Sequence, residues 1–190
     1  MGVVSIVILA VIVVVLVYLI MLYNDLVQVK NNVSKAWANI DVLLKQRHDE
    51  LPKLIETCKQ YMKFEQETLQ KVIDARSRVF AARESRDIRA LGPAEAGLRA
   101  SVGNLFAVAE QYPELKTNQT FLQLQSRISG LENAIADRRE FYNESVNINN
   151  VRIEQFPGAL IASRFGFKAA QLLEFANAEK TDVDVKELFK

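Results

Sequence analysis

The sequence has few of the residues from which catalytic and metal sites are usually built. It contains one cysteine, Cys58, and one histidine, His48. An internal disulfide needs two cysteines, a di-iron helical bundle needs a Glu-x-x-His motif from each of two helices, and a zinc site needs three or four ligands. We therefore expect no metal and no cofactor. Cys58 lies in an apolar pattern, so we interpret it as a small buried hydrophobe rather than a nucleophile, and His48 as a packing or solvated histidine.

Residues that interrupt helices are also scarce. The chain has seven glycines and four prolines, and neither type occurs between Val3 and Leu51. No strand pattern is present, so no glycine-rich phosphate loop following a strand is expected. The 24 basic residues nearly balance the 23 acidic ones, which gives no general attraction to nucleic acid. The composition predicts an all-α protein that is not an enzyme and has no nucleic-acid partner.

One long apolar run stands out in this sequence. Val3 to Leu22 is twenty residues without a charge, and sixteen of them are Val, Ile or Leu. A helix of this length matches the roughly 30 Å hydrocarbon core of a bilayer. Tyr18 and Tyr23 lie near its end, where aromatic rings favour the headgroup level. A cleaved signal peptide would need a basic region, a shorter apolar core and a small-residue cleavage site, so we expect an uncleaved membrane anchor.

The charges that follow the apolar run suggest its orientation. Lys30 and Lys35 lie within about fifteen residues of the run and are opposed by Asp25. The positive-inside rule therefore favours a single-pass protein with an external N-terminus and a cytoplasmic domain.

Apolar residues continue at helical spacing beyond the anchor, so the membrane helix is expected to extend into the following domain. Pro52 predicts a kink in one helix reaching about Glu84, with a hairpin at that point as the alternative. Gly92-Pro93 is interpreted as the start of a helix that reaches about Tyr112 and ends at Pro113. Trp37 is expected in the core.

A seven-residue apolar repeat follows, typical of a coiled coil: Phe121, Ile128, Ile135, Tyr142, Asn149 and Phe156. Its helix is expected to be capped by Thr120 with Gln123, or by Thr117 or Asn118. Phe156-Pro157-Gly158 is expected to close it. The apolar segment that follows, residues 159–178, is expected to dock on the bundle, with a membrane or a neighbouring subunit as alternatives.

Several charged or polar residues fall at or beside the inward positions of these helices. If they are buried they must pair, because an unpaired buried charge is very costly. We predict a structural polar layer that fixes helix register and contains at least one carboxylate–arginine pair; a contact patch for a partner or a subunit is the alternative. Its members are Asp41, Arg47, Glu132, Arg138, Arg139 and Asn143, with Glu65 as a further candidate.

The whole chain resembles the LemA family. After the anchor, matching elements occur in the same order as in that family: Tyr23-Asn24, Ala36-Trp37, Ile40-Asp41-Val42, Leu51-Pro52, Tyr112-Pro113-Glu114-Leu115, Glu132-Asn133, Arg138-Arg139, Tyr142-Asn143, Phe156-Pro157 and Gly166-Phe167. Lys53 stands where the family more often has Asn. The resemblance implies a single-pass protein of the bacterial inner membrane with a cytoplasmic helical bundle. One branch of the family takes part in building magnetosome membranes, and family genes often neighbour a membrane metalloprotease of the HtpX type.

These inferences together predict a membrane anchor at residues 1–23, an elongated antiparallel helical bundle at 24–180 and a flexible tail at 181–190. The favoured function is a self-associating scaffold without catalytic activity, whose partners are the lipid bilayer and other copies of itself. The alternative is an adaptor or regulator of a membrane protease or of an envelope-stress system.

Overall fold

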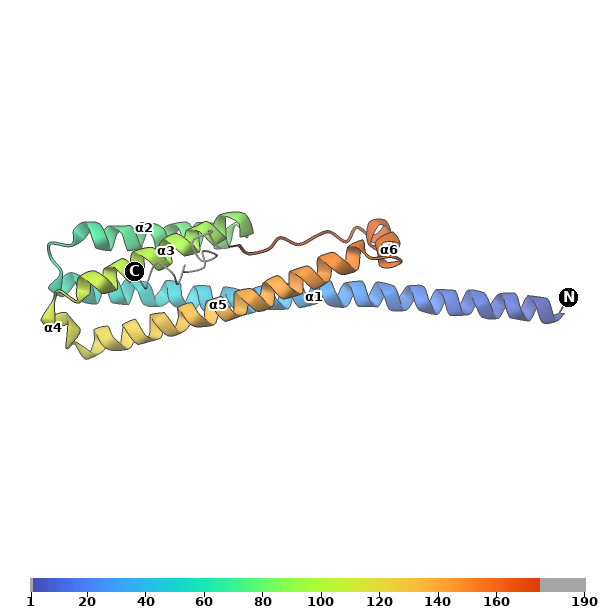
Figure 1. The fold of residues 1–190 in the computed structure, drawn as a ribbon, viewed down its shortest axis with the longest axis horizontal. Coiled ribbons are helices and arrows are strands. Elements are labelled where there is room, and N and C mark those ends of the chain that lie inside the picture. Colours follow the sequence, from blue (N-terminus) through green and yellow to red (C-terminus); the bar gives the residue numbers. More distant parts are fainter. Residues whose placement is uncertain (1, 175–190) are drawn as a thin grey trace, which may run out of the picture. The chain divides into compact units, whose positions relative to one another are not determined.

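The computed structural model describes residues 2–174, which form six helices and no strand (Figure 1). The helices are α1 (Gly2–Tyr61), α2 (Gln66–Glu84), α3 (Ile88–Ala109), α4 (Pro113–Lys116), α5 (Gln119–Glu154) and α6 (Gly158–Phe165). The predicted all-α class is confirmed. The tail predicted at 181–190 lies outside the described residues, as do residues 175–178 of the apolar segment.

The chain divides into two compact units. Among the described residues, unit 1 contains 2–42 together with 136–172, and unit 2 contains 43–135 together with 173 and 174. The boundary at residues 42 and 43 falls inside α1, and the boundary at residues 135 and 136 falls inside α5. The predicted division into anchor, bundle and tail stays a prediction.

α1 continues through Pro52, as expected, but it ends at Tyr61. The prediction that one helix reaches Glu84 was wrong, because residues 62–65 turn and α2 begins at Gln66. The turn allows the buried face of α2, including Val72 and Val79, to pack within unit 2. Neither glycine nor proline marks this break, so it is set by tertiary packing.

Pro52 is tolerated because another side chain satisfies the carbonyl that it leaves without a donor. A proline has no backbone N–H for the carbonyl four residues earlier, which here belongs to His48. The Nε of Arg76, on α2, donates to the His48 oxygen at 3.0 Å. The Nη2 of Arg76 lies 2.6 Å from His48 Nε2, and the His48 ring stacks on Phe80 at 4.9 Å. The carbonyl that Pro52 leaves without a donor is thus satisfied by a contact from the next helix.

α3 starts earlier than predicted. Asp87 is its N-cap, and its carboxylate accepts from the backbone nitrogens of Arg89 and Ala90, both at 3.0 Å. Gly92 and Pro93 therefore lie inside the helix and do not begin it. Gly92 is needed for space, since a Cβ there would lie 1.8 Å from the backbone oxygen of Glu174.

The boundaries on either side of α4 also differ from the prediction. α3 ends at Ala109, and Pro113 begins α4 instead of only ending the preceding helix. Asn118 caps α5, because its Oδ1 accepts from the Phe121 nitrogen at 3.0 Å. Thr120 lies inside the helix, so of the three proposed caps Asn118 is the one that acts.

The seven-residue repeat of α5 is buried except at its last position. Phe121, Ile128, Ile135, Tyr142 and Asn149 are buried, while Phe156 is 83% exposed because α5 has already ended at Glu154. Trp37, expected in the core, is half-buried, with its ring 6.0 Å from that of Tyr142.

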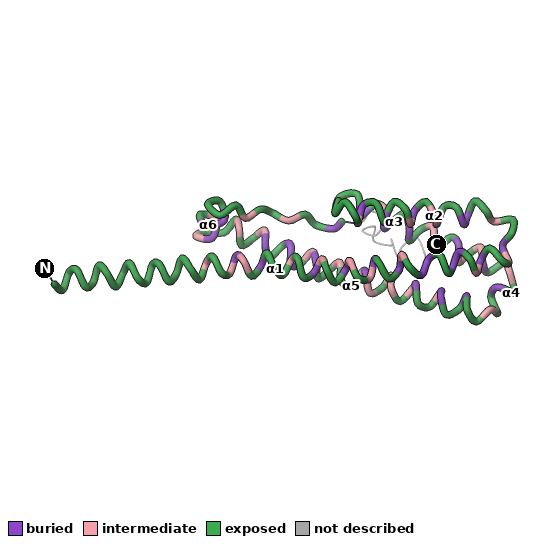
Figure 2. Tube along the Cα trace, turned by 180° about the vertical axis from the view of Figure 1, so that it is seen from behind, coloured by how far each residue is buried: buried purple, intermediate pink, exposed green. Residues whose placement is uncertain are grey.

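The N-terminal stretch of α1 is exposed along its whole length. Residues 2–21 are all exposed, whereas Leu26 and Val29 of the same helix are buried (Figure 2). Leu26 belongs to a core cluster of unit 1 with Ile161 and Ala162 of α6, and Leu22 packs against this cluster. The exposed stretch therefore ends where α6 begins to cover α1.

Candidate functional site

The core of unit 2 contains a buried ion pair. Arg47 of α1 and Glu95 of α3 are each only 2% exposed, and Nη2 of Arg47 lies 2.5 Å from both carboxylate oxygens of Glu95. α1 places Arg47 between the buried Leu44 and Leu51. Two charges removed from water in this way are tolerated only because they are paired.

Glu132 of α5 adds a second carboxylate to the pair. Burial raises the pKa of Glu132, the Arg47 and Arg99 guanidinium groups oppose that change, and the Glu95 carboxylate adds to it. Within residues 2–174, Arg47 Nε and Glu132 Oε1 are buried without a hydrogen-bond partner. We call Arg47, Glu95 and Glu132 the charged core cluster. Because each residue comes from a different helix, the cluster joins α1, α3 and α5.

The predicted polar layer is distributed over both units. Arg47 and Glu132 lie in the charged core cluster of unit 2, while the other members lie in unit 1. Of these, Asp41, Arg139 and Asn143 are half-buried and Arg138 is exposed. The structure therefore brings two of the six residues together, and the layer as a whole stays a prediction.

Two carboxylates of unit 2, Glu95 and Glu50, were not predicted from the sequence, although both carry a detectable signal. Glu95 lies on the same face of α3 as the buried Leu91 and Leu98, four residues after one and three before the other. Glu50 is buried beside Leu51, and its Oε1 lies 3.3 Å from Arg127 Nη2, which joins α1 to α5.

The other candidates from the sequence, Glu65, Cys58 and His48, contact other residues of the fold or are buried in it. The Glu65 carboxylate accepts from the Tyr112 hydroxyl at 3.3 Å. Cys58 is fully buried, and burial raises the pKa of its thiol to about 12. Burial and the nearby Arg76 lower the pKa of His48. Among residues 2–174, no group of three His, Cys, Asp or Glu side chains is placed to hold a metal ion.

Unit 1 contains a different arrangement, in which α5 holds an extended segment at residues 167–172. Asn150 binds the backbone of Ala170 twice: its Oδ1 accepts from the nitrogen at 2.9 Å and its Nδ2 donates to the oxygen at 3.0 Å. The Tyr142 hydroxyl donates to the Gln171 oxygen at 2.9 Å. We call this set the amide clasp. It recognises backbone groups and needs no charge.

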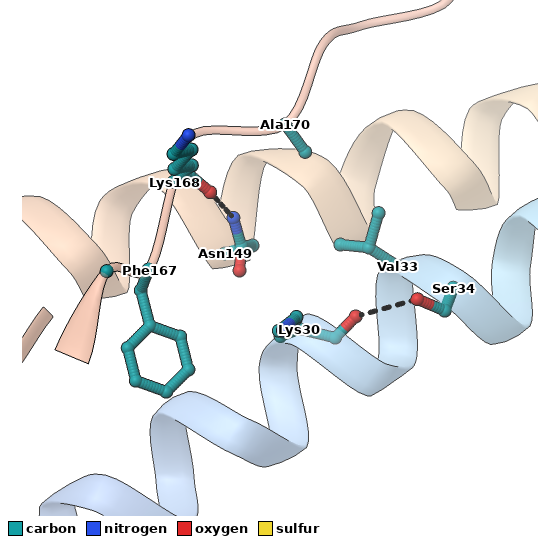
Figure 3. Close-up of a pocket in the computed structure, with 8 residues that line it drawn as sticks. Lys30, Val33, Ser34, Asn149, Phe167, Lys168 and Ala170 are labelled. Carbon is teal, nitrogen blue, oxygen red and sulfur yellow. Dashed lines mark hydrogen bonds between the residues drawn. The ribbon is translucent and has the colours of Figure 1, made fainter. Parts of the chain in front are cut away.

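A groove of about 260 Å³ lies beside the amide clasp (Figure 3). Its walls come from α1, α5 and the extended segment, and the Nζ of Lys30 lies 5.9 Å from the centre of the Phe167 ring. Asn149 points toward the segment and donates to the Lys168 oxygen at 3.5 Å. The lining residues are Lys30, Val33, Ser34, Asn149, Gly166, Phe167, Lys168 and Ala170.

The residues assigned to the membrane anchor lie along the exposed part of α1. Val3 and Tyr18 are exposed, Leu22 is half-buried, and Tyr23 contacts Phe165 with the ring centres 5.0 Å apart. By length and hydropathy, α1 is the one helix among those described that could cross a membrane, and its most apolar window is entirely unburied. This part of α1 is a candidate membrane span.

Comparison with known proteins decides the family. The model of the LemA family matches residues 36–186, most of the chain. The protein belongs to the LemA family. This LemA-family chain is 28% identical to the protein LemA of Metamycoplasma hominis over 87% of its own length and 74% of that protein. It is 24% identical to the magnetosome protein MamQ 2 of Paramagnetospirillum magneticum, over 90% and 72% of the two chains, and 23% identical to MamQ of Magnetospirillum gryphiswaldense over the same shares.

Proposed function

We propose that this LemA-family protein is a membrane-anchored helical scaffold that self-associates in the bacterial inner membrane, with its bundle on the cytoplasmic side. The observation that carries the proposal is the change of environment along α1. Residues 2–21 expose a continuous apolar surface, while the buried residues from Leu26 onward join the same helix to a packed core. A surface of that size without a protein neighbour fits lipid.

The family comparison supports the coarser part of this proposal. Membership in the LemA family and similarity to proteins named for the magnetosome agree with a membrane-associated protein without a catalytic role. The charged core cluster and the amide clasp both join parts of the chain to one another, as expected for a structural protein.

An apolar stripe on α5 supports self-association. Phe141, Ile148 and Val151 are exposed, and their spacing of seven and three residues places them on one face of the helix. This is the pattern by which helices pair in coiled coils. In unit 1 the stripe is separate from the buried face that carries Tyr142 and Asn149.

Mass photometry of the full-length protein in lipid nanodiscs or mild detergent tests this function. We expect assemblies larger than the monomer, which Phe141→Ser with Ile148→Ser should dissociate. Leu122→Ser, an exposed apolar-to-polar change on the same helix but outside the stripe, is the control and should leave the assemblies intact. A protein that is monomeric at micromolar concentration would contradict the scaffold. If such a monomer were recovered from membranes with a protease, the adaptor role would replace it.

A further inference from the structure

α6 lies beside α1 at the point where the apolar stretch ends (Figures 1 and 2). Its inner face is anchored there, because Ile161 and Ala162 pack with Leu26 and against Leu22. At its C-terminal end, the Phe165 ring contacts the Tyr23 ring at 5.0 Å. Tyr23 directly follows the twenty apolar residues, so α6 is held at the level where a bilayer would meet water.

The rest of α6 exposes apolar side chains, as does Phe156, two residues before the helix. Phe156 is 83% exposed, Leu160 is 64% exposed and Phe165 is 63% exposed. We call these three residues the α6 surface. Exposed apolar groups of this size, gathered within ten residues, are typical of an interaction site. The surface is continuous with the exposed apolar stretch of α1 through the Phe165–Tyr23 contact.

The charges around this surface are those expected beside anionic lipid. Residues 22–35 and 150–170, which surround the end of the span in unit 1, contain five basic and two acidic residues. Arg152, Arg164 and Lys168 are exposed, and Lys30 lies by the Phe167 ring. Basic residues next to a span are attracted to the negative surface of the cytoplasmic leaflet.

We propose that the α6 surface is a membrane-interface element. Phe156, Leu160 and Phe165 insert into the boundary between headgroups and acyl chains of the leaflet in which the α1 span ends, and the surrounding basic residues lie among anionic headgroups. The protein would then hold the membrane at two places, by a span and by a short helix lying in the interface. This inference rests on the proposed membrane anchor, and it adds a lipid contact from the other end of the chain.

Depth-dependent quenching by brominated phospholipids tests the inference. The full-length protein with Trp37→Phe provides a background without tryptophan, into which Phe165→Trp is introduced. After reconstitution into bilayers with anionic lipid, we expect the emission of this variant to shift to the blue and to be quenched by bromine near the headgroups. Leu160→Trp, outside the aromatic contact, should respond in the same way and serves if Phe165→Trp does not fold.

Two further variants separate the possible outcomes. Val42→Trp is the control, since Val42 is also an exposed apolar residue of unit 1 but lies twenty residues beyond Leu22 along α1, and it should not be quenched. Leu9→Trp reports the span and should be quenched by bromine deep in the acyl chains. Quenching at position 9 but not at 165 and 160 overturns the α6 inference alone, and no quenching at position 9 overturns the membrane anchor. A blue-shifted but unquenched tryptophan at 165 and 160 would mean that another protein copy covers the surface, which also overturns the inference.

Discussion

The two units differ in the polar groups that they bury, which are mostly charged in unit 2 and neutral in unit 1. Unit 2 buries the charges of Arg47 and Glu95, and the half-buried Glu132 adds a carboxylate from a third helix. Unit 1 buries neutral groups on α5, where Asn149 and Tyr142 join Asn150 in holding the backbone of an extended segment.

The difference indicates what each arrangement is suited to do. A buried ion pair is satisfied only by its specific partner, so it strongly penalises a shifted helix register. Asparagine side chains donate and accept at once and fit any peptide backbone, so they can hold a segment that has no helix of its own. Unit 2 is therefore expected to be the more sensitive to loss of a polar side chain.

Removal of Arg47 should have the largest effect. Arg47→Met leaves Glu95 buried without its partner, and loss of one member of a buried pair typically costs about 3–5 kcal/mol. Urea unfolding of the full-length protein in mild detergent, followed by circular dichroism, measures this loss. Arg47→Met combined with Glu95→Leu should recover much of the stability, because the Glu95 carboxylate is removed with its partner and Glu132 keeps the Arg99 guanidinium nearby. A cost no greater than that of Arg138→Met, an exposed change, would contradict the interpretation.

Removal of Arg76 should have the second-largest effect, because Arg76 satisfies the His48 carbonyl that Pro52 leaves without a donor. Arg76→Met removes the donor to the His48 oxygen, and a hydrogen bond from a charged group contributes about 1.5–3 kcal/mol. In a Pro52→Ala background the new backbone N–H can serve that oxygen, so Arg76→Met should cost less there. The same unfolding measurement on the four proteins of this double-mutant cycle gives the coupling free energy between Arg76 and Pro52. Equal costs in both backgrounds would show that Arg76 does not compensate for the proline.

Much of the fold could be predicted because the apolar pattern is long and regular. The helical spacing of apolar residues beyond the anchor predicted that the membrane helix extends into the domain, where Leu26, Val29, Ile40 and Leu44 of α1 are buried. Five positions of the predicted seven-residue repeat are buried on α5. The turn at 62–65 could not be predicted in this way, since its residues carry no local signal. Gly92 was misinterpreted as a helix start because the need for glycine at this position comes from the backbone of Glu174, which is far away in the sequence.

The candidate sites were less accessible to sequence reasoning. Arg47 was predicted because it interrupts an apolar stripe, but its partner Glu95 was missed, because Gly92-Pro93 was interpreted as a helix start. The amide clasp gave no signal, because Asn150 is unremarkable in a helix and residues 169–172 do not reveal that they run extended. Both sites depend on pairings between distant residues, and periodicity within one helix does not report such pairings.

Disruption of the amide clasp should have a smaller and more local effect. Asn150→Ala removes both hydrogen bonds to Ala170, at about 0.5–1.5 kcal/mol for each neutral bond. The first consequence should be faster hydrogen exchange at residues 167–172, with α2 and α3 of unit 2 unchanged. Asn147→Ala, an exposed change on α5, is the control. Unaltered exchange in Asn150→Ala would show that the segment is held by its apolar residues instead.

The smallest expected effect is a pH dependence caused by Glu132. Its pKa in the folded protein is raised above the ordinary 4.5. Between these two values the unfolded chain has lost a proton that the folded protein still binds, so the free energy of unfolding should fall as pH rises through this window. The effect should be modest, because Glu132 is only half-buried and Arg47 offsets part of the cost of its charge. Glu132→Gln should flatten the decline in urea unfolding measured from pH 4.5 to neutral pH, while Glu140→Gln on the exposed side of α5 should not. A decline of the same slope in Glu132→Gln would mean that another group titrates, and the charged core cluster would then hold Glu132 ionised throughout.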